Sequence, residues 1–130
     1  MDDELADAVF GAIEAGDIDA VAGMWADDVE VWHNTDDVVQ TKDQNLAVLQ
    51  WMVDNTASIE YRDTVRSGTV DGFVQRHVLH LTFDDGRVAD LPAAIFVGIR
   101  NGKVARIDEY LDSAHVAEAF APPRDGKATR

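Results

Sequence analysis

Hydrophobic residues recur with the period of a helix in the first part of the chain. Three stretches have apolar residues on one face and acidic or polar residues on the other, which predicts three helices. Gly16 ends the first helix, Asp17 caps the second, and Asp43 caps the third. Between the second and third helices, residues 29–33 alternate as a short strand, and a polar loop follows at 34–41.

The hydrophobic period changes to two in the second part of the chain, which predicts strands. Asp84-Asp85-Gly86 and Asn101-Gly102 are typical hairpin turns, and Pro92 indicates a bulge or an edge position within its strand. A short helical turn is expected at 113–120. The four predicted strands cover residues 58–67, 73–83, 87–100 and 103–112.

Three helices followed by a four-stranded antiparallel meander form an α+β plan. A twisted sheet can wrap around the helices as a curved cone and enclose an apolar pocket between sheet and helices. We expect residues 1–121 to form this single domain and residues 122–130 to be a disordered tail. Apolar residues on both faces of the strand at 95–99 predict a homodimer through the convex face of the sheet.

The composition excludes several classes of partner. The chain of 130 residues has 25 acidic and 11 basic side chains, a formal charge of −14 that repels phosphate backbones, so we expect no nucleic-acid partner. This acidity fits either a coding bias or adaptation to high salt. There is no cysteine, and therefore no thiolate nucleophile. Without a membrane-length apolar run or a basic leader, we expect no membrane contact and a cytoplasmic location.

Three motifs occur in a characteristic order: Ala15-Gly16-Asp17-Ile18-Asp19, then Trp25-Ala26-Asp27-Asp28, and finally the segment from Gly102 to Asp112. Their order and spacing, over residues 5 to about 120, resemble the nuclear transport factor 2-like superfamily in its SnoaL-like branch. That branch includes polyketide cyclases and ketosteroid isomerase-like proteins. The resemblance implies a cone-shaped fold in which the first strand delivers a polar group into an apolar pocket. Because this fold hosts many reactions and also non-enzymes, it does not fix the chemistry.

The resemblance also locates the first candidate site residue. Matching the opening segments places His33 where ketosteroid isomerases carry their general-base aspartate. Their oxyanion site uses a tyrosine from the first helix and a protonated acid from a late strand. Those positions fall on Val9 and near Ala94 or Ile95, so an authentic ketosteroid isomerase is not expected. A related proton-transfer or hydration chemistry stays open.

His33 and Glu109 are the candidate catalytic residues. His33 shares a strand face with Val29 and Val31, and a neutral imidazole can accept or donate a proton near neutral pH. Glu109 alternates with Ile107 and Leu111, which makes it a carboxylate in an apolar wall if that face is the pocket face. The alternatives are an exposed strand-end histidine and an outer-face salt bridge.

Arg76 and His80 are candidates for binding a substrate oxygen, because they share one face of a long strand. If the strand has the opposite orientation, Gln75 and His77 face the pocket instead.

Three further residues are candidate substrate contacts: Trp32, Asn34 and Asp90. The first two flank His33. Strict alternation directs Asp90 away from the pocket, but a bulge at Pro92 could turn it inward.

The leading hypothesis is a SnoaL-like enzyme that acts on a small, apolar, cyclic molecule in the pocket. It uses no cofactor and no metal, since the histidines lack the spacing of metal ligands. Isomerisation, cyclisation, dehydration and hydration are all compatible with these residues. The alternative is a non-catalytic module of the same fold, which binds an apolar ligand or serves for dimerisation.

Overall fold

The computed structural model describes residues 3–121, which form an α+β fold as predicted. The predicted tail at 122–130 lies outside the described residues. The helices are α1 (Asp3–Glu14), α2 (Ile18–Met24), α3 (Lys42–Asp54) and α4 (Ser113–Ala119). The strands are β1 (Trp25–His33), β2 (Val38–Gln40), β3 (Thr56–Gly68), β4 (Gly72–Phe83), β5 (Val88–Arg100) and β6 (Lys103–Leu111).

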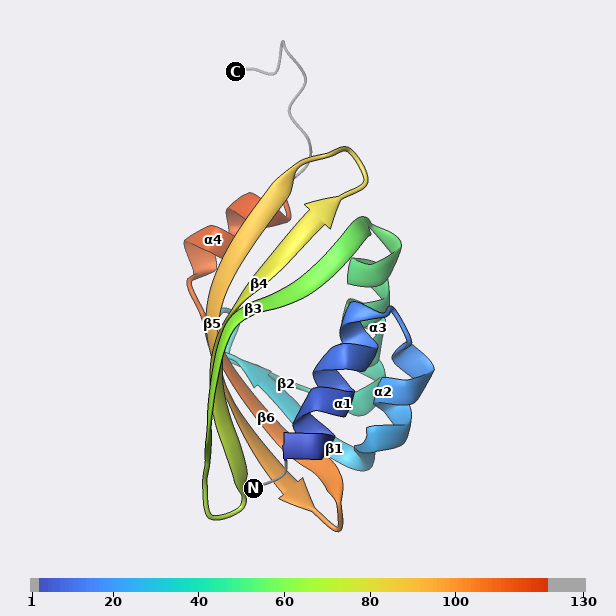
Figure 1. Cartoon of the computed structure of the whole chain (residues 1–130), viewed down its shortest axis with the longest axis vertical. Coiled ribbons are helices and arrows are strands. Elements are labelled where there is room, and N and C mark those ends of the chain that lie inside the picture. The colour runs from blue at the N-terminus through green and yellow to red at the C-terminus, as the bar shows by residue number, and fades with distance from the viewer. Residues whose placement is uncertain (1–2, 122–130) are drawn as a thin grey trace.

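The strands form one sheet in the order β2-β1-β6-β5-β4-β3. The meander of β3 to β6 is confirmed as antiparallel, while β1 joins its end in parallel with β6 and β2 forms the edge beyond. The long strands bend strongly, so the sheet curves around α1, α2 and α3, which cover its concave face (Figure 1). The predicted cone-shaped arrangement of a curved sheet around three N-terminal helices is therefore confirmed.

The first strand is longer than predicted. It begins at Trp25, and the pairing with β6 shifts between Trp25 and Glu30, so that Asp27 and Asp28 bulge out of the strand. Ion pairs with Lys42 and Arg100 hold these two carboxylates. The Trp25-Ala26-Asp27-Asp28 motif is thus an irregular part of β1.

The segment after β1 also differs from the prediction. The polar loop at 34–41 contains β2, which pairs with the end of β1. Thr41, rather than Asp43, caps α3: its side chain accepts a hydrogen bond from the main chain of Gln44, and the Gln44 side chain accepts one from Thr41. This reciprocal capping box fixes where α3 starts and so where it crosses the sheet.

The predicted turns of the meander are present. Asn101 and Gly102 have φ values of 54° and 75°, as a two-residue hairpin turn requires. The pairing of β5 with β6 ends at Ala93, which is opposite Leu111, so the neighbouring Pro92 pairs with β4 alone. It is therefore in the edge position that its missing N–H favours.

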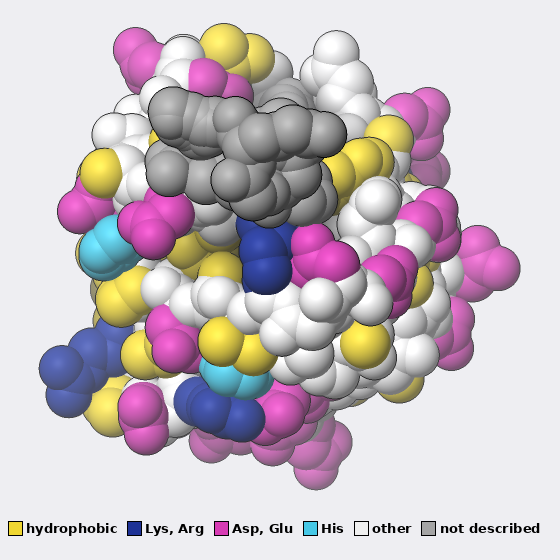
Figure 2. Space-filling view, turned by 90° about the horizontal axis from the view of Figure 1, so that it is seen from above, with side chains coloured by type: hydrophobic (Ala, Val, Ile, Leu, Met, Phe, Trp, Pro, Cys, Tyr) yellow, Lys and Arg dark blue, Asp and Glu magenta, His cyan; other side chains and the backbone are white. Residues whose placement is uncertain are grey.

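One face of the sheet is buried against the helices and the other is open. In β4 the residues with odd numbers from 73 to 83 are buried, while those with even numbers face outward. Figure 2 shows acidic side chains around one end of the molecule, with basic side chains at few places there. Within residues 3–121, no helix is long and apolar enough to cross a membrane.

Candidate functional site

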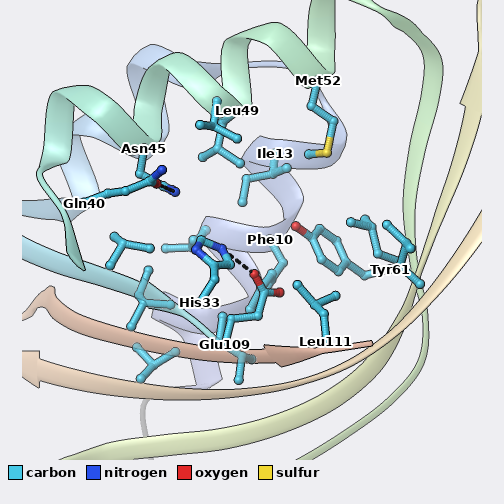
Figure 3. Close-up of a pocket in the computed structure, with 18 of the residues that line it drawn as sticks. Phe10, Ile13, His33, Gln40, Asn45, Leu49, Met52, Tyr61, Glu109 and Leu111 are labelled. Atoms are coloured by element: carbon cyan, nitrogen blue, oxygen red, sulfur yellow. Dashed lines mark hydrogen bonds and ion pairs between the residues drawn. The ribbon is translucent and has the colours of Figure 1, made fainter. Parts of the chain in front are cut away.

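A cavity of about 370 Å³ lies between the concave face of the sheet and the helices α1 and α3. Most of its wall is aliphatic or aromatic, including Phe10, Ile13, Leu49 and Met52, which project toward one another in Figure 3. Exposed residues such as Asp36, Val48 and Trp51 also line it, so the cavity opens to solvent. The described part of the fold thus provides an accessible apolar pocket with few polar groups.

His33 and Glu109 form the polar centre of this pocket. They are direct partners in the parallel pairing of β1 with β6, so their side chains leave the sheet on the same face. His33 Nε2 lies 2.9 Å from Glu109 Oε1, and the two side chains are 20% and 18% exposed. Figure 3 shows the pair within the apolar wall. The structure therefore brings together the two residues that the sequence singled out as catalytic candidates.

The contact with Glu109 determines the direction of the pKa shift of His33 and which ring nitrogen carries the proton. Burial lowers the pKa of His33, but the hydrogen bond to Glu109 and the charges of Glu109 and Asp36 outweigh it and raise the pKa above 6.5. Because an ionised carboxylate only accepts hydrogen bonds, Nε2 carries the proton in this pair. In the neutral imidazole, Nδ1 then carries the lone pair that can accept a proton.

Asn34 holds the strand ends that carry the pair. Its side-chain oxygen accepts a hydrogen bond from Leu111 N at 2.8 Å, and its amide nitrogen donates to Leu111 O at 3.0 Å. The main-chain N–H of Asn34 also donates to Glu109 O at 3.1 Å. Asn34 therefore ties β1 to β6 directly beside His33. It does not line the cavity, so the expectation that it contacts substrate is replaced by a structural role.

The other predicted substrate contacts lie outside the pocket. Arg76, His80 and Asp90 project from the convex face, where His80 Nδ1 is 2.7 Å from its cross-strand partner Asp90 Oδ1. The reason is the orientation of β4, which directs Gln75 and His77 inward instead. Trp32 also faces outward, where its indole N–H donates to Asp37 at 2.7 Å and its ring packs against Tyr110. We therefore do not assign substrate binding to these residues.

Gln75 and His77 face inward but are buried beneath other side chains. Arg66 Nε donates to Gln75 Oε1 at 2.8 Å, which turns the Gln75 amide nitrogen toward His77 Nδ1 at 2.9 Å. His77 Nδ1 is then an acceptor, and Nε2 carries the proton. The ring packs edge-on against Phe10 and Tyr61, and burial lowers the pKa of His77. This network anchors the sheet under the cavity rather than lining it.

The structure adds polar pocket residues that the sequence did not single out. Tyr61 from β3 directs its hydroxyl into the cavity, and Gln40 and Asn45 face His33 from the opposite side (Figure 3). Asn45 Nδ2 donates to Gln40 Oε1 at 2.7 Å. The alternation of Ile59 with Tyr61 could have indicated that Tyr61 faces inward. No comparable signal marks Gln40, because β2 lies in a predicted loop.

The resemblance matched the oxyanion donors of ketosteroid isomerases to Val9 and to a position near Ala94 or Ile95, all of them aliphatic. Val9 and Ile95 line the cavity, whereas Ala94 does not. Among residues 3–121, no group of three or more histidine and acidic side chains could hold a metal ion. The titratable groups that project into the mostly apolar pocket in Figure 3 are the imidazole of His33, the carboxylate of Glu109 and the phenol of Tyr61.

Comparison with known proteins identifies the family. The model of a SnoaL-like domain matches residues 6–107. The chain belongs to this family. No curated protein matches the sequence.

Solved structures similar to this SnoaL-like protein include two proposed polyketide cyclases. One, from Pseudomonas putida, is 27% identical with a TM-score of 0.75, over 88% of this chain and 94% of that chain. The other, from Xanthomonas campestris, is 24% identical with a TM-score of 0.74, over 92% and 93%. A protein with a ketosteroid isomerase-like fold from Catenulispora acidiphila, in complex with trimethylamine, is 14% identical with a TM-score of 0.77, over 92% and 94%. These last two likenesses show the fold alone.

Proposed function

We propose that this protein is a cofactor-independent enzyme of the SnoaL-like type that transfers protons on an apolar, cyclic small molecule. The observation that carries the proposal is the His33–Glu109 pair, with Nε2 and Oε1 2.9 Å apart, in the wall of a mostly apolar cavity. A histidine oriented by a carboxylate is a common general acid–base arrangement. Polar groups in such a pocket are commonly those that orient a ligand or react with it.

Each member of the pair has a separate role in this proposal. Glu109 keeps the proton on Nε2 and balances the charge of the imidazolium. Nδ1 of His33 removes a proton from a carbon atom or a water molecule and returns it at another position. Isomerisation, cyclisation, dehydration and hydration each consist of such transfers, so the same two residues can serve any of them.

The volume, wall and charge of the pocket's surroundings also indicate the class of substrate. Its volume of about 370 Å³ is within the range of small-molecule sites, roughly 300–1,000 Å³. Apolar walls favour a hydrocarbon skeleton of a few rings. The formal charge of −14 disfavours anionic molecules, because the potential of the whole protein repels them. An uncharged ring compound fits these three properties best.

The proposal can be tested by exchange of the protons next to a ring carbonyl. 2-Tetralone in D₂O is followed by NMR with the wild-type protein and with His33→Gln. We expect the wild type to accelerate exchange and the variant to lose at least about a hundredfold of that acceleration, the lower end of the effect of a general base. His115→Gln is the matched control, since His115 is an exposed histidine on α4. Equal rates in His33→Gln and the wild type would contradict the proposal.

A non-catalytic ligand-binding module is the second candidate. It is favoured by the aliphatic residues at the two oxyanion positions, Val9 and Ile95, which leave less polar assistance than in ketosteroid isomerases. This candidate predicts that 2-tetralone binds without faster exchange. The exchange experiment therefore separates the two functions.

We further propose that two copies pair through the convex face of the sheet. Phe96 and Tyr110 are 47% and 46% exposed there. Tyr110 packs edge-on against both Phe96 and Trp32, so the three rings form a continuous aromatic surface. Aromatic residues are enriched at the centres of protein interfaces, which favours a second copy as the cover.

A further inference from the structure

The most informative unassigned group is the phenol of Tyr61. It enters the cavity from β3, on the far side of the pocket from Gln40 and Asn45, and its hydroxyl points toward the region that holds His33 and Glu109 (Figure 3). No expectation from the sequence included it. It is also the one tyrosine of the two in the chain that lines the cavity, since Tyr110 is on the convex face.

The main chain and ring of Tyr61 are firmly held. Its main-chain N–H donates to Glu14 Oε2 of α1 at 2.9 Å. Its ring packs edge-on against Phe10 and His77, with centroids 4.8 Å away in each case. These contacts hold the ring from two sides and leave the hydroxyl at the free end, directed into the cavity. Tyr61 is thus a preorganised donor rather than a mobile surface phenol.

The surroundings also keep this phenol protonated. Burial raises the pKa of Tyr61, and the negative charges of Glu109 and Glu14 raise it further. A protonated phenol donates one hydrogen bond. In an apolar cavity such a donor favours an acceptor on the ligand, because a polar ligand atom without a partner would be costly to bury.

We infer that Tyr61 donates a hydrogen bond to a carbonyl oxygen of the ligand, so that the pocket takes ring ketones. This inference rests on the proposed function and specifies its substrate class. It also assigns the donor role to a strand residue, whereas the positions expected from the resemblance carry Val9 and Ile95.

The inference gives a balanced reaction step. His33 Nδ1 takes a proton from the carbon next to the carbonyl, which breaks a C–H bond and forms an N–H bond. The electron pair of the C–H bond becomes part of a C=C bond, and the carbonyl π pair moves onto oxygen. Tyr61 stabilises the resulting enolate oxygen by its hydrogen bond. Return of the proton from His33 to the same or another carbon restores the neutral imidazole.

The test measures binding and therefore does not depend on turnover. Affinities of 2-tetralone and of tetralin, which lacks only the carbonyl oxygen, are measured for the wild type, Tyr61→Phe and Tyr110→Phe. We expect the wild type and Tyr110→Phe to prefer the ketone by about five- to tenfold, the effect of one net hydrogen bond. In Tyr61→Phe this preference falls to about one, while tetralin binds as before, which also shows that the variant is folded.

Infrared spectroscopy of the bound ketone gives a second readout on the wild type alone. The carbonyl stretch of 2-tetralone in the pocket lies at lower frequency than in hexane if Tyr61 donates to it. An unchanged stretch, or a ketone preference that persists in Tyr61→Phe, overturns the inference and leaves the role of His33 intact. Failure of both compounds to bind the wild type would instead overturn the pocket on which the proposed function rests.

Discussion

Asn34 and Leu111 are joined by two hydrogen bonds across the end of the parallel strand pair. The Asn34 side chain accepts from Leu111 N at 2.8 Å and donates to Leu111 O at 3.0 Å. His33 precedes Asn34 directly, and Glu109 is two residues before Leu111. The side-chain amide of Asn34 therefore joins the ends of β1 and β6 directly beside the His33–Glu109 pair.

The first prediction concerns this amide. Asn34→Ala removes both side-chain bonds, so the ends of β1 and β6 separate more easily and the His33–Glu109 contact loosens. We expect the pKa of His33, measured by NMR titration, to fall relative to wild type. The free energy of unfolding should decrease by about 0.5–1.5 kcal/mol for each solvent-accessible bond lost.

Asn55→Ala provides the control for Asn34. Asn55 Nδ2 donates to Trp51 O at the end of α3, so its removal also deletes an exposed side-chain bond to the main chain. This variant should lose stability without changing the titration of His33. An unaltered His33 pKa in Asn34→Ala would show that the amide does not position the pair.

The second prediction concerns Glu109→Gln. Burial is the largest influence on the pKa of His33 and lowers it, so loss of the Glu109 charge should bring that pKa below 6.5. In the wild type the pKa is raised on folding, so this group contributes stability below pH 6.5 that is lost as pH rises through the folded pKa. The stability difference between wild type and Glu109→Gln should therefore be larger at pH 6 than at pH 8.5 in urea titrations. A difference independent of pH would contradict the ion pair.

The third prediction is that the stability linked to His77 changes with pH in the opposite sense to that linked to His33. Burial lowers the pKa of His77, so its neutral form contributes stability above pH 6.5 that is lost as pH falls toward the folded pKa. His77→Phe keeps an aromatic ring in place and removes this proton linkage. The unfolding free energy of wild type relative to this variant should decrease between pH 7 and pH 5. The opposite slope would mean that His77 is stabilised in its charged form.

The fourth prediction tests pairing through the convex face. Phe96→Glu places a charge in the centre of the proposed aromatic surface, where burial against a second copy would be costly. We expect sedimentation velocity to give a dimer for wild type and a monomer for Phe96→Glu. Val70→Glu is the control, because Val70 is fully exposed at the turn between β3 and β4. A monomeric wild type would refute the pairing.

Some of the site could be predicted because alternation along a strand is a local property. Ile107, Glu109 and Leu111 share one face of β6, and this face is the concave one. In β4 both alternating sets contain polar residues, so the orientation was ambiguous. The large apolar side chains of Phe73 and Leu81 mark the buried face, and they outweigh Val74 and Val78 on the other.

The remaining features depend on contacts between distant parts of the chain. The parallel pairing of β1 with β6, which brings His33 to Glu109, joins segments about 76 residues apart and has no local signal. β2 has three residues and pairs with β1, so its formation depends on the edge that β1 offers. In β3 the alternation of Ile59 with Tyr61 holds, but the pairing shifts after Arg62, where Asp63 has a φ of 54°, so alternation does not carry through the whole strand.

The most direct test of the account is the pH dependence of proton exchange into 2-tetralone, measured beside the NMR titration of His33. If neutral His33 is the base, the rate rises with pH and its midpoint coincides with the pKa of His33, above 6.5 in the wild type. In Glu109→Gln both midpoints should move together to below 6.5. A rate without a midpoint, or one that stays in place while the pKa of His33 moves, would contradict the assignment of His33 as the proton-transfer group.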